Sequence, residues 1–146
     1  MKMQIKGILF DFDGTIANTI DLIIATFEHT CREVLGFTPE REKIVATFGL
    51  PLPEAMIALS GKPELVETMR DAYREYNNAH HDDMIRSIPG VKETLEQLKA
   101  QGIKLAVVTS KKPPMLRRGM DCLQLTPYFD ATVAPVSYTH LRAHET

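Results

Sequence analysis

Two aspartates stand close together at the end of an apolar run near the start of the chain. Asp11 and Asp13 follow residues 8–10 (ILF), and Gly14 and Thr15 come next. Neighbouring carboxylates repel each other unless a cation balances them, and Mg²⁺ favours one or two carboxylates together with water and phosphate oxygens. The pattern therefore indicates a divalent cation at this place.

The spacing does not fit a calcium-binding EF-hand loop. Counted from Asp11, such a loop needs Gly where Ile16 stands and Glu where Leu22 stands. Phosphoryl chemistry suits the pair better, because Asp11 can attack phosphorus to form an aspartyl-phosphate. Asp13 can protonate the leaving oxygen and later take a proton from the hydrolytic water. Gly14 would let the backbone turn sharply after the acids.

Polar residues also follow a second apolar run, at residues 103–108. Thr109 would offer a hydroxyl, and Ser110 a backbone N–H, to the phosphoryl oxygens. The alternative is a plain turn in which these hydroxyls cap the next helix. Lys111 and Lys112 are interpreted first as exposed turn charges, with an approach of Lys111 to phosphate as the second interpretation.

The elements that must position these residues alternate between strands and helices. Apolar and β-branched runs predict strands at 4–10, 103–109 and 131–134, and helical spacing predicts helices at 91–99 and 113–123. Such alternation is typical of an α/β fold with a parallel sheet, which binds ligands beyond the carboxyl ends of its strands. The first strand does not alternate in polarity, so it is expected to be covered on both faces.

Residues 18–85 carry only helix signals. Thr38 is expected to cap a helix that has Pro39 at its first position. His80 and His81 precede two aspartates, and a solvated helix end is favoured there over a metal site. The four expected helices cover residues 18–35, 38–48, 53–60 and 63–78.

Composition excludes several classes of partner. The 146 residues carry a net charge of −2, so no basic excess exists to bind nucleic acid or an anionic membrane surface. The N-terminus does not resemble a signal peptide, and no stretch approaches transmembrane length. Cys31 and Cys122 fall in helical patterns and are expected as small apolar core residues without a disulfide, as in a cytoplasmic protein.

The motif D-F-D-G-T at 11–15, the helical stretch after it and L-A-V-V-T-S-K at 105–111 together resemble the haloacid dehalogenase superfamily of phosphatases. Within it, the chain is most similar to members with a helical cap after the first motif, such as phosphoglycolate phosphatases and pyrophosphatases. The founding dehalogenases lack the second aspartate, because a halide needs no proton on leaving. Asp13 therefore favours phosphoryl chemistry.

The resemblance implies a Rossmann-like core that carries an inserted helical cap. Mg²⁺ would be the cofactor, held by the Asp11 carboxylate and the Asp13 backbone carbonyl, and a small phosphorylated metabolite would be the substrate. Residues 48–51 resemble the cap loop that reaches over the substrate, although Gly49 could equally serve as a helix stop. The expected phosphate- or substrate-binding residues are Gly14, Thr15, Gly49, Thr109, Ser110 and Lys111.

The chain departs from the family pattern after residue 135. A third motif with a lysine and a fourth with further aspartates are not found, and residues 136–146 read as sequence foreign to the family. The expected organisation is a discontinuous core at 1–17 and 86–135, a cap at 18–85 and a non-family tail. Without the later strands the first strand would be an open apolar edge, so a weak or inactive, poorly stable enzyme is expected.

Two alternatives to a hydrolase remain at this point. A sugar phosphomutase of the same superfamily uses the same first motif but returns the phosphoryl group to a sugar instead of water. A non-catalytic fragment, with residual phosphate or metal binding at most, would explain the missing motifs. Oligomeric state does not follow from the sequence.

Overall fold

The computed structural model describes residues 3–135, so the expected tail at 136–146 lies outside the described residues. Two compact units divide the chain. The first comprises Met1–Asn18 and Ile85–Thr146, and the second comprises Thr19–Met84. Among the described residues, no helix is both long enough and apolar enough to cross a membrane.

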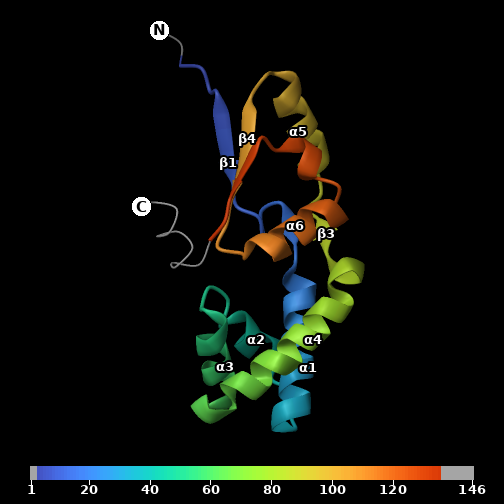
Figure 1. Cartoon of the computed structure of the whole chain (residues 1–146). Coiled ribbons are helices and arrows are strands. Elements are labelled where there is room, and N and C mark those ends of the chain that lie inside the picture. Colours follow the sequence, from blue (N-terminus) through green and yellow to red (C-terminus); the bar gives the residue numbers. More distant parts are fainter. Residues whose placement is uncertain (1–2, 136–146) are drawn as a thin grey trace. The chain divides into compact units, whose positions relative to one another are not determined.

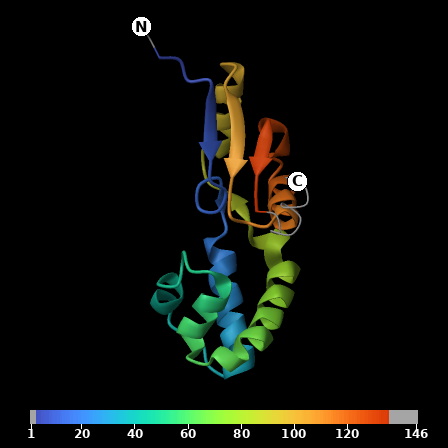
Figure 2. The ribbon, with the colours of Figure 1, turned by 60° about the vertical axis from the view of Figure 1, so that its left-hand side comes forward.

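The first unit is built on a parallel sheet of three strands (Figures 1 and 2). β1 (Gly7–Phe10) pairs with β4 (Lys104–Val108), which pairs with β5 (Ala131–Val133). The predicted parallel α/β sheet is therefore confirmed. Its register sets Phe10 beside Val107, so β1 and β4 end at the same edge.

Helices cover one face of this sheet. Leu105 and Val107 of β4 are fully buried and pack against Leu95 of α5 (Val91–Ala100). Leu116 and Met120 of α6 (Pro113–Cys122) join the same cluster. Alternate β4 residues point to this face, as the period of a strand requires.

The other face of the sheet is open within the described residues. Leu9 is 72% exposed and Val133 is 57% exposed, and Val108 is also exposed. The expectation that β1 is covered on both faces is wrong, because Leu9 lies on the side that neither α5 nor α6 covers. β1 is also an edge strand of the described sheet, with apolar side chains beside unpaired backbone groups.

A short antiparallel ribbon connects the two segments of the first unit. β2 (Ala17–Asn18) pairs with β3 (Arg86–Ser87), and the Ile88 N–H donates to the Ile16 carbonyl at 2.9 Å. No sequence pattern predicted this ribbon. Two residues are too few for hydrophobic alternation to show a strand.

The second unit is helical, as expected. Its elements are α1 (Ile20–Leu35), α2 (Arg41–Val45), α3 (Leu52–Ser60), the 3₁₀ helix η1 (Pro63–Leu65) and α4 (Val66–Met84). The prediction for α2 is wrong at its start, because Glu40 and not Thr38 is its N-cap, and the Thr38 hydroxyl accepts from Arg32 at 3.3 Å. α4 continues well past the predicted end at Asn78.

An apolar cluster joins these helices. Phe27 and Cys31 of α1 pack with Ile44, Met56 and Met69, and all five are buried. Cys31 is therefore the small core residue that was predicted. Cys122 is exposed, which corrects its predicted burial, and neither cysteine is in a disulfide.

The histidines at the end of α4 differ from the predicted solvated pair. His81 is 1% exposed, and its Nδ1 is hydrogen-bonded to an Asp82 carboxylate oxygen at 2.7 Å. His80 is exposed and packs on Tyr76, with ring centroids 4.2 Å apart. Adjacent helical residues point in different directions, which accounts for the contrast.

Asp130 connects the end of the 3₁₀ helix η2 (Thr126–Tyr128) to the sheet. One of its carboxylate oxygens accepts the Leu105 N–H at 2.8 Å, and the other accepts the Lys99 ammonium at 3.0 Å. The Leu105 hydrogen bond and then the Lys99 charge lower the pKa of this carboxyl.

Because its folded-state pKa is lowered, Asp130 contributes stability at neutral pH that is lost as the pH falls through that value. We expect Asp130→Asn to lower the melting temperature at pH 7. The difference from the unaltered chain should shrink between about pH 5 and pH 2. Thermal melts across this range, with exposed Asp71→Asn as the control, check this; a difference independent of pH would contradict it.

Burial raises the pKa of the Cys31 thiol to about 11. We expect iodoacetamide at pH 8 to modify Cys122 in the folded protein while Cys31 stays unmodified. Peptide mass spectrometry before and after denaturation measures both sites. Equal labelling of the two cysteines in folded protein would show that the second unit is not packed as described.

Candidate active site

The two aspartates lie on a tight loop directly after β1. Asp11 is exposed, Asp13 is half-buried, and Phe12 between them is fully buried. The Phe12 N–H donates to an Asp11 carboxylate oxygen at 2.8 Å. Burial of the aromatic ring therefore anchors a segment whose two neighbouring carboxylates remain accessible.

Backbone hydrogen bonds close this loop. The Phe12 carbonyl accepts the N–H groups of Thr15, Ile16 and Ala17 at 3.3, 3.0 and 3.0 Å, and the Gly14 N–H donates to the Ala17 carbonyl at 2.8 Å. Gly14 has φ 81°, a left-handed conformation that glycine adopts without a steric penalty. The sharp turn predicted at Gly14 is confirmed.

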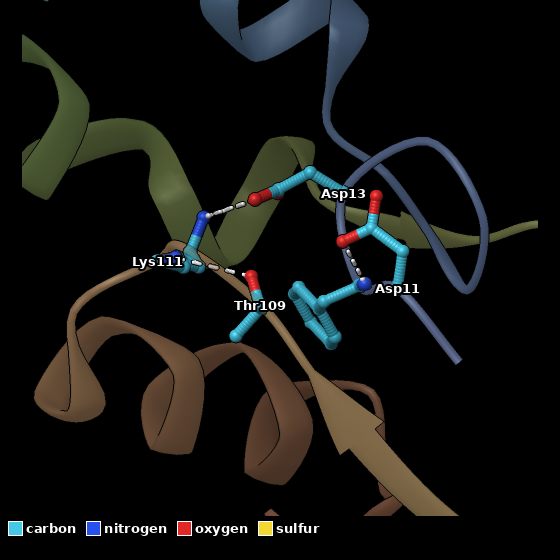
Figure 3. A network of polar contacts seen from close by, with 5 residues as sticks. Asp11, Asp13, Thr109 and Lys111 are labelled. Atoms are coloured by element: carbon cyan, nitrogen blue, oxygen red, sulfur yellow. Dashed lines mark hydrogen bonds and ion pairs between the residues drawn. The ribbon is translucent and has the colours of Figure 1, made fainter. Parts of the chain in front are cut away.

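The segment after β4 reaches this loop (Figure 3). Lys111 Nζ lies 3.1 Å from one Asp13 carboxylate oxygen, and their side chains are 19% and 37% exposed. The Lys111 backbone N–H donates to the Thr109 hydroxyl at 3.0 Å, which fixes the turn that carries the lysine. One cation and two carboxylates are therefore gathered at the carboxyl ends of neighbouring strands.

The first interpretation of Lys111, as an exposed turn charge, is wrong, since Lys111 contacts Asp13. Lys112 is exposed at the N-cap of α6, as that interpretation holds. A parallel pairing of β1 with β4 could have indicated the contact between Lys111 and Asp13, because parallel pairing brings the carboxyl ends of two strands together.

The other predicted residues have different surroundings. Thr109 is half-buried and Ser110 is exposed beside the lysine. Thr15 is exposed and lines a pocket of about 170 Å³ with residues of the α5 N-terminus. Gly49 belongs to the second unit, where it has φ 93° in a turn after α2.

The loop offers part of a magnesium site. Mg²⁺ usually keeps several waters and takes one or two carboxylates with substrate phosphate oxygens, and the exposed Asp11 carboxylate fits this role. Within residues 3–135, no group of three or more His, Cys, Asp or Glu side chains is placed to hold a metal. The described donor set therefore fits a weakly held cation that phosphate helps to bind.

Phe12 was not singled out by any pattern in the sequence. An apolar residue between two charged ones gives no periodic signal, so the sequence does not show that it is buried. The burial of Phe12 results from its packing in the core, where residues of α6 also lie. Lys111 Nζ also lies 5.8 Å from the centroid of the Phe12 ring, within the range of a cation–π contact.

Residues 8–142 match the haloacid dehalogenase-like hydrolase family. This match includes the first part of segment 136–146, which was expected to be foreign to the family. A candidate pyrophosphatase PpaX from Clostridium perfringens is 41% identical over 132 residues, which are 90% of this chain and 61% of the relative. The chain thus spans about three-fifths of the length of such curated relatives.

Solved structures share the fold. A candidate phosphoglycolate phosphatase from Haemophilus somnus superposes with a TM-score of 0.80 at 23% identity, covering 90% of this chain and 63% of that one. A candidate β-phosphoglucomutase from Thermotoga maritima superposes with a TM-score of 0.74 at 25% identity, covering 89% and 61%. The sequence match over most of the chain decides the assignment: this protein belongs to the haloacid dehalogenase-like hydrolase family.

Proposed function

We propose that the protein is a Mg²⁺-dependent hydrolase of a small phosphomonoester or of pyrophosphate. The observation that carries the proposal is the meeting of Asp11, Asp13 and Lys111 at the carboxyl ends of β1 and β4. Ligands of open parallel sheets bind at this edge. The relatives named as pyrophosphatases support the same class of reaction.

In the proposed reaction, a carboxylate oxygen of Asp11 attacks phosphorus, and the bond from phosphorus to the leaving oxygen breaks. Asp13 gives its proton to that oxygen. Water then attacks the aspartyl-phosphate while Asp13 takes back a proton, which releases phosphate and regenerates Asp11. Asp13 suits both steps because it stands two positions after the nucleophile, on the same hydrogen-bonded loop.

The segment after β4 would bind the transferred group. The Thr109 hydroxyl and the Ser110 N–H are proposed to donate to phosphoryl oxygens, with Gly14 and Thr15 at the opposite loop. Lys111 would exchange its contact with Asp13 for the incoming phosphoryl charge. Such donors, held in place before substrate arrives, stabilise charge that develops during transfer.

Magnesium would be held by the Asp11 carboxylate and the Asp13 backbone carbonyl. When bound, it would neutralise charge on the phosphoryl oxygens and so favour attack by an anionic nucleophile. The remaining ligands would be water and phosphate oxygens.

We further propose that residues 1–17 and 86–135 act as the catalytic core and residues 18–85 as a cap. The turn at Gly49, with Phe48 and Leu50 exposed beside it, would contribute to substrate choice. A small metabolite is the proposed partner, without nucleic acid or membrane, in the cytoplasm. The chain would be a weak catalyst, because its described residues would offer few acidic ligands to a bound metal ion.

A sugar phosphomutase is the second candidate function, favoured by the structural similarity to the Thermotoga maritima protein. Such an enzyme would pass the phosphoryl group from Asp11 to a sugar hydroxyl. Stimulation of sugar-phosphate interconversion by a bisphosphorylated sugar would support it, and steady release of inorganic phosphate would support the hydrolase.

We expect Asp11→Asn to abolish Mg²⁺-dependent hydrolysis of p-nitrophenyl phosphate, a loss of at least about a thousandfold, because an amide is a poor nucleophile. Turnover is measured with Mg²⁺ and with EDTA, beside Asp71→Asn as a matched control. Activity that survives in Asp11→Asn would overturn the assigned nucleophile. Absence of turnover in well-folded unaltered protein would favour the non-catalytic alternative.

Replacing Lys111 with methionine should weaken binding of inorganic phosphate in the presence of Mg²⁺ by about tenfold, since a charge-assisted hydrogen bond is lost. Calorimetric titration measures the dissociation constant. Lys112→Met removes an equal charge from the adjacent, exposed position and should change it little. Equal effects of the two variants would mean that Lys111 acts only through long-range charge.

A further inference from the structure

Gly119 lies inside α6, a position where glycine is less favourable than alanine. The local backbone geometry does not require glycine, since the φ of Gly119 is not left-handed. Glycine inside a helix can instead reflect a close approach by a neighbouring group. Gly119 is also buried, so its neighbours are other core residues.

The neighbour is the ring of Phe12. A Cβ built on Gly119 would meet Phe12 Cζ at 2.9 Å and Phe12 Cε2 at 3.1 Å, with Ile85 Cδ1 at 3.5 Å. All eight glycines lie within the described residues, and among them only Gly119 shows a contact below 3.0 Å for a built Cβ. At six other glycines, a built Cβ would meet no atom within 4 Å apart from those of its chain neighbours. The close contact is therefore specific to Gly119.

A larger residue at position 119 would force the Phe12 ring or α6 to shift, because the built Cβ lies closer to the ring than real contacts allow. The ring is fully buried within the core cluster of the first unit, where Leu116 and Met120 also pack. Interiors are close-packed, so an inserted methyl group displaces what it meets. The packed core restricts the two side-chain torsions of Phe12, so a shift of the ring that these torsions do not absorb moves its Cα.

Movement of the Phe12 backbone reaches both acids. Its N–H donates to Asp11 and its carbonyl closes the loop that follows Asp13. The same helix begins at Pro113, two residues after Lys111, and Lys111 contacts Asp13 at 3.1 Å. α6 is thus connected to the acid loop in two ways: by packing against the Phe12 ring, and by the chain that leads from Lys111 into the helix.

We propose that Gly119 is a positioning residue: its missing side chain lets the Phe12 ring seat against α6, and this contact sets where Asp11 and Asp13 lie. The catalytic meaning of this position rests on the proposed phosphoryl-transfer function. The mechanical link between α6 and the acid loop does not depend on that function.

The test compares Gly119→Ala, Phe12→Leu and the double variant with the unaltered chain. Leucine lacks the Cζ and Cε atoms that the new methyl group would meet, so it should relieve the contact. Arg117→Ala, at an exposed position of α6, is the control for changes in the helix itself. Each protein is assayed for kcat and KM with p-nitrophenyl phosphate, for its melting temperature, and by ¹⁵N–¹H spectra of the amides of residues 11–15.

We expect Gly119→Ala to lower kcat by about 10- to 100-fold, since small displacements of reacting groups have effects of this size. KM should stay within about twofold, because the loss falls on the chemical step. The amides of residues 11–15 should shift in Gly119→Ala and not in Arg117→Ala. In the Phe12→Leu background, Gly119→Ala should change kcat by less than about threefold, which is the non-additivity expected of touching residues.

A lower melting temperature with unchanged kcat and unchanged amides would overturn the proposal, since Gly119 would then be only a packing residue. Equal kcat losses in both backgrounds would also overturn it. If Gly119→Ala does not fold, a folded double variant that matches Phe12→Leu in turnover supports the proposal, and an unfolded double variant overturns it.

Failure of the proposed function gives a separate result. If the unaltered chain shows no Mg²⁺-dependent turnover, hydrolysis is not its activity, while the amide shifts still decide whether Gly119 sets the loop. Shifts in Gly119→Ala that Phe12→Leu abolishes would then support the mechanical link. Absence of such shifts would overturn it.

Discussion

The parallel pairing of β1 with β4 is the constraint on which the site depends. It sets Phe10 beside Val107, so the chain leaves both strands at one edge. Lys111 and Asp13 are 98 residues apart in sequence, yet an ion pair joins them. An antiparallel or shifted pairing would place the lysine elsewhere, and no local feature of either loop could restore the contact.

Electrostatics and packing then act on the same few residues. Two carboxylates on one short loop repel each other, and Lys111 offsets part of that charge at the Asp13 side. The pair is partly exposed, so its contribution to stability is small. Its importance lies in geometry, because Phe12 of the loop packs in the same apolar cluster as Leu116 and Met120 of α6, the helix that follows Lys111 in the chain.

The two faces of the sheet differ in how far their side chains are buried. Its helix-covered face is buried, while Leu9, Val108 and Val133 remain exposed on the other within the described residues. Exposed apolar side chains beside an edge strand favour association with other chains. The edge strand β1 ends in the acid loop, so an exposed edge of the sheet adjoins the proposed chemistry.

Local patterns in the chain were enough to predict the element types and to locate the acid motif. Apolar runs and helix stops located β1, β4, α1 and α5, and the residue types around Asp11 were enough to indicate phosphoryl chemistry. These signals are local, because periodicity, caps and turn residues act within a few positions. The start of α2 and the end of α4 were misplaced, since propensity leaves helix ends poorly specified.

Which of these residues meet became known from the folded arrangement alone. It brought Lys111 to Asp13, buried His81 beside an exposed His80, and left Leu9 uncovered. It also set the Phe12 ring against Gly119, a contact that neither residue's neighbours in sequence suggest. The cause is the same in each case, because burial and contact depend on which distant segments the sheet and helices bring together. A single sequence shows which residue types are present but not which of them become neighbours.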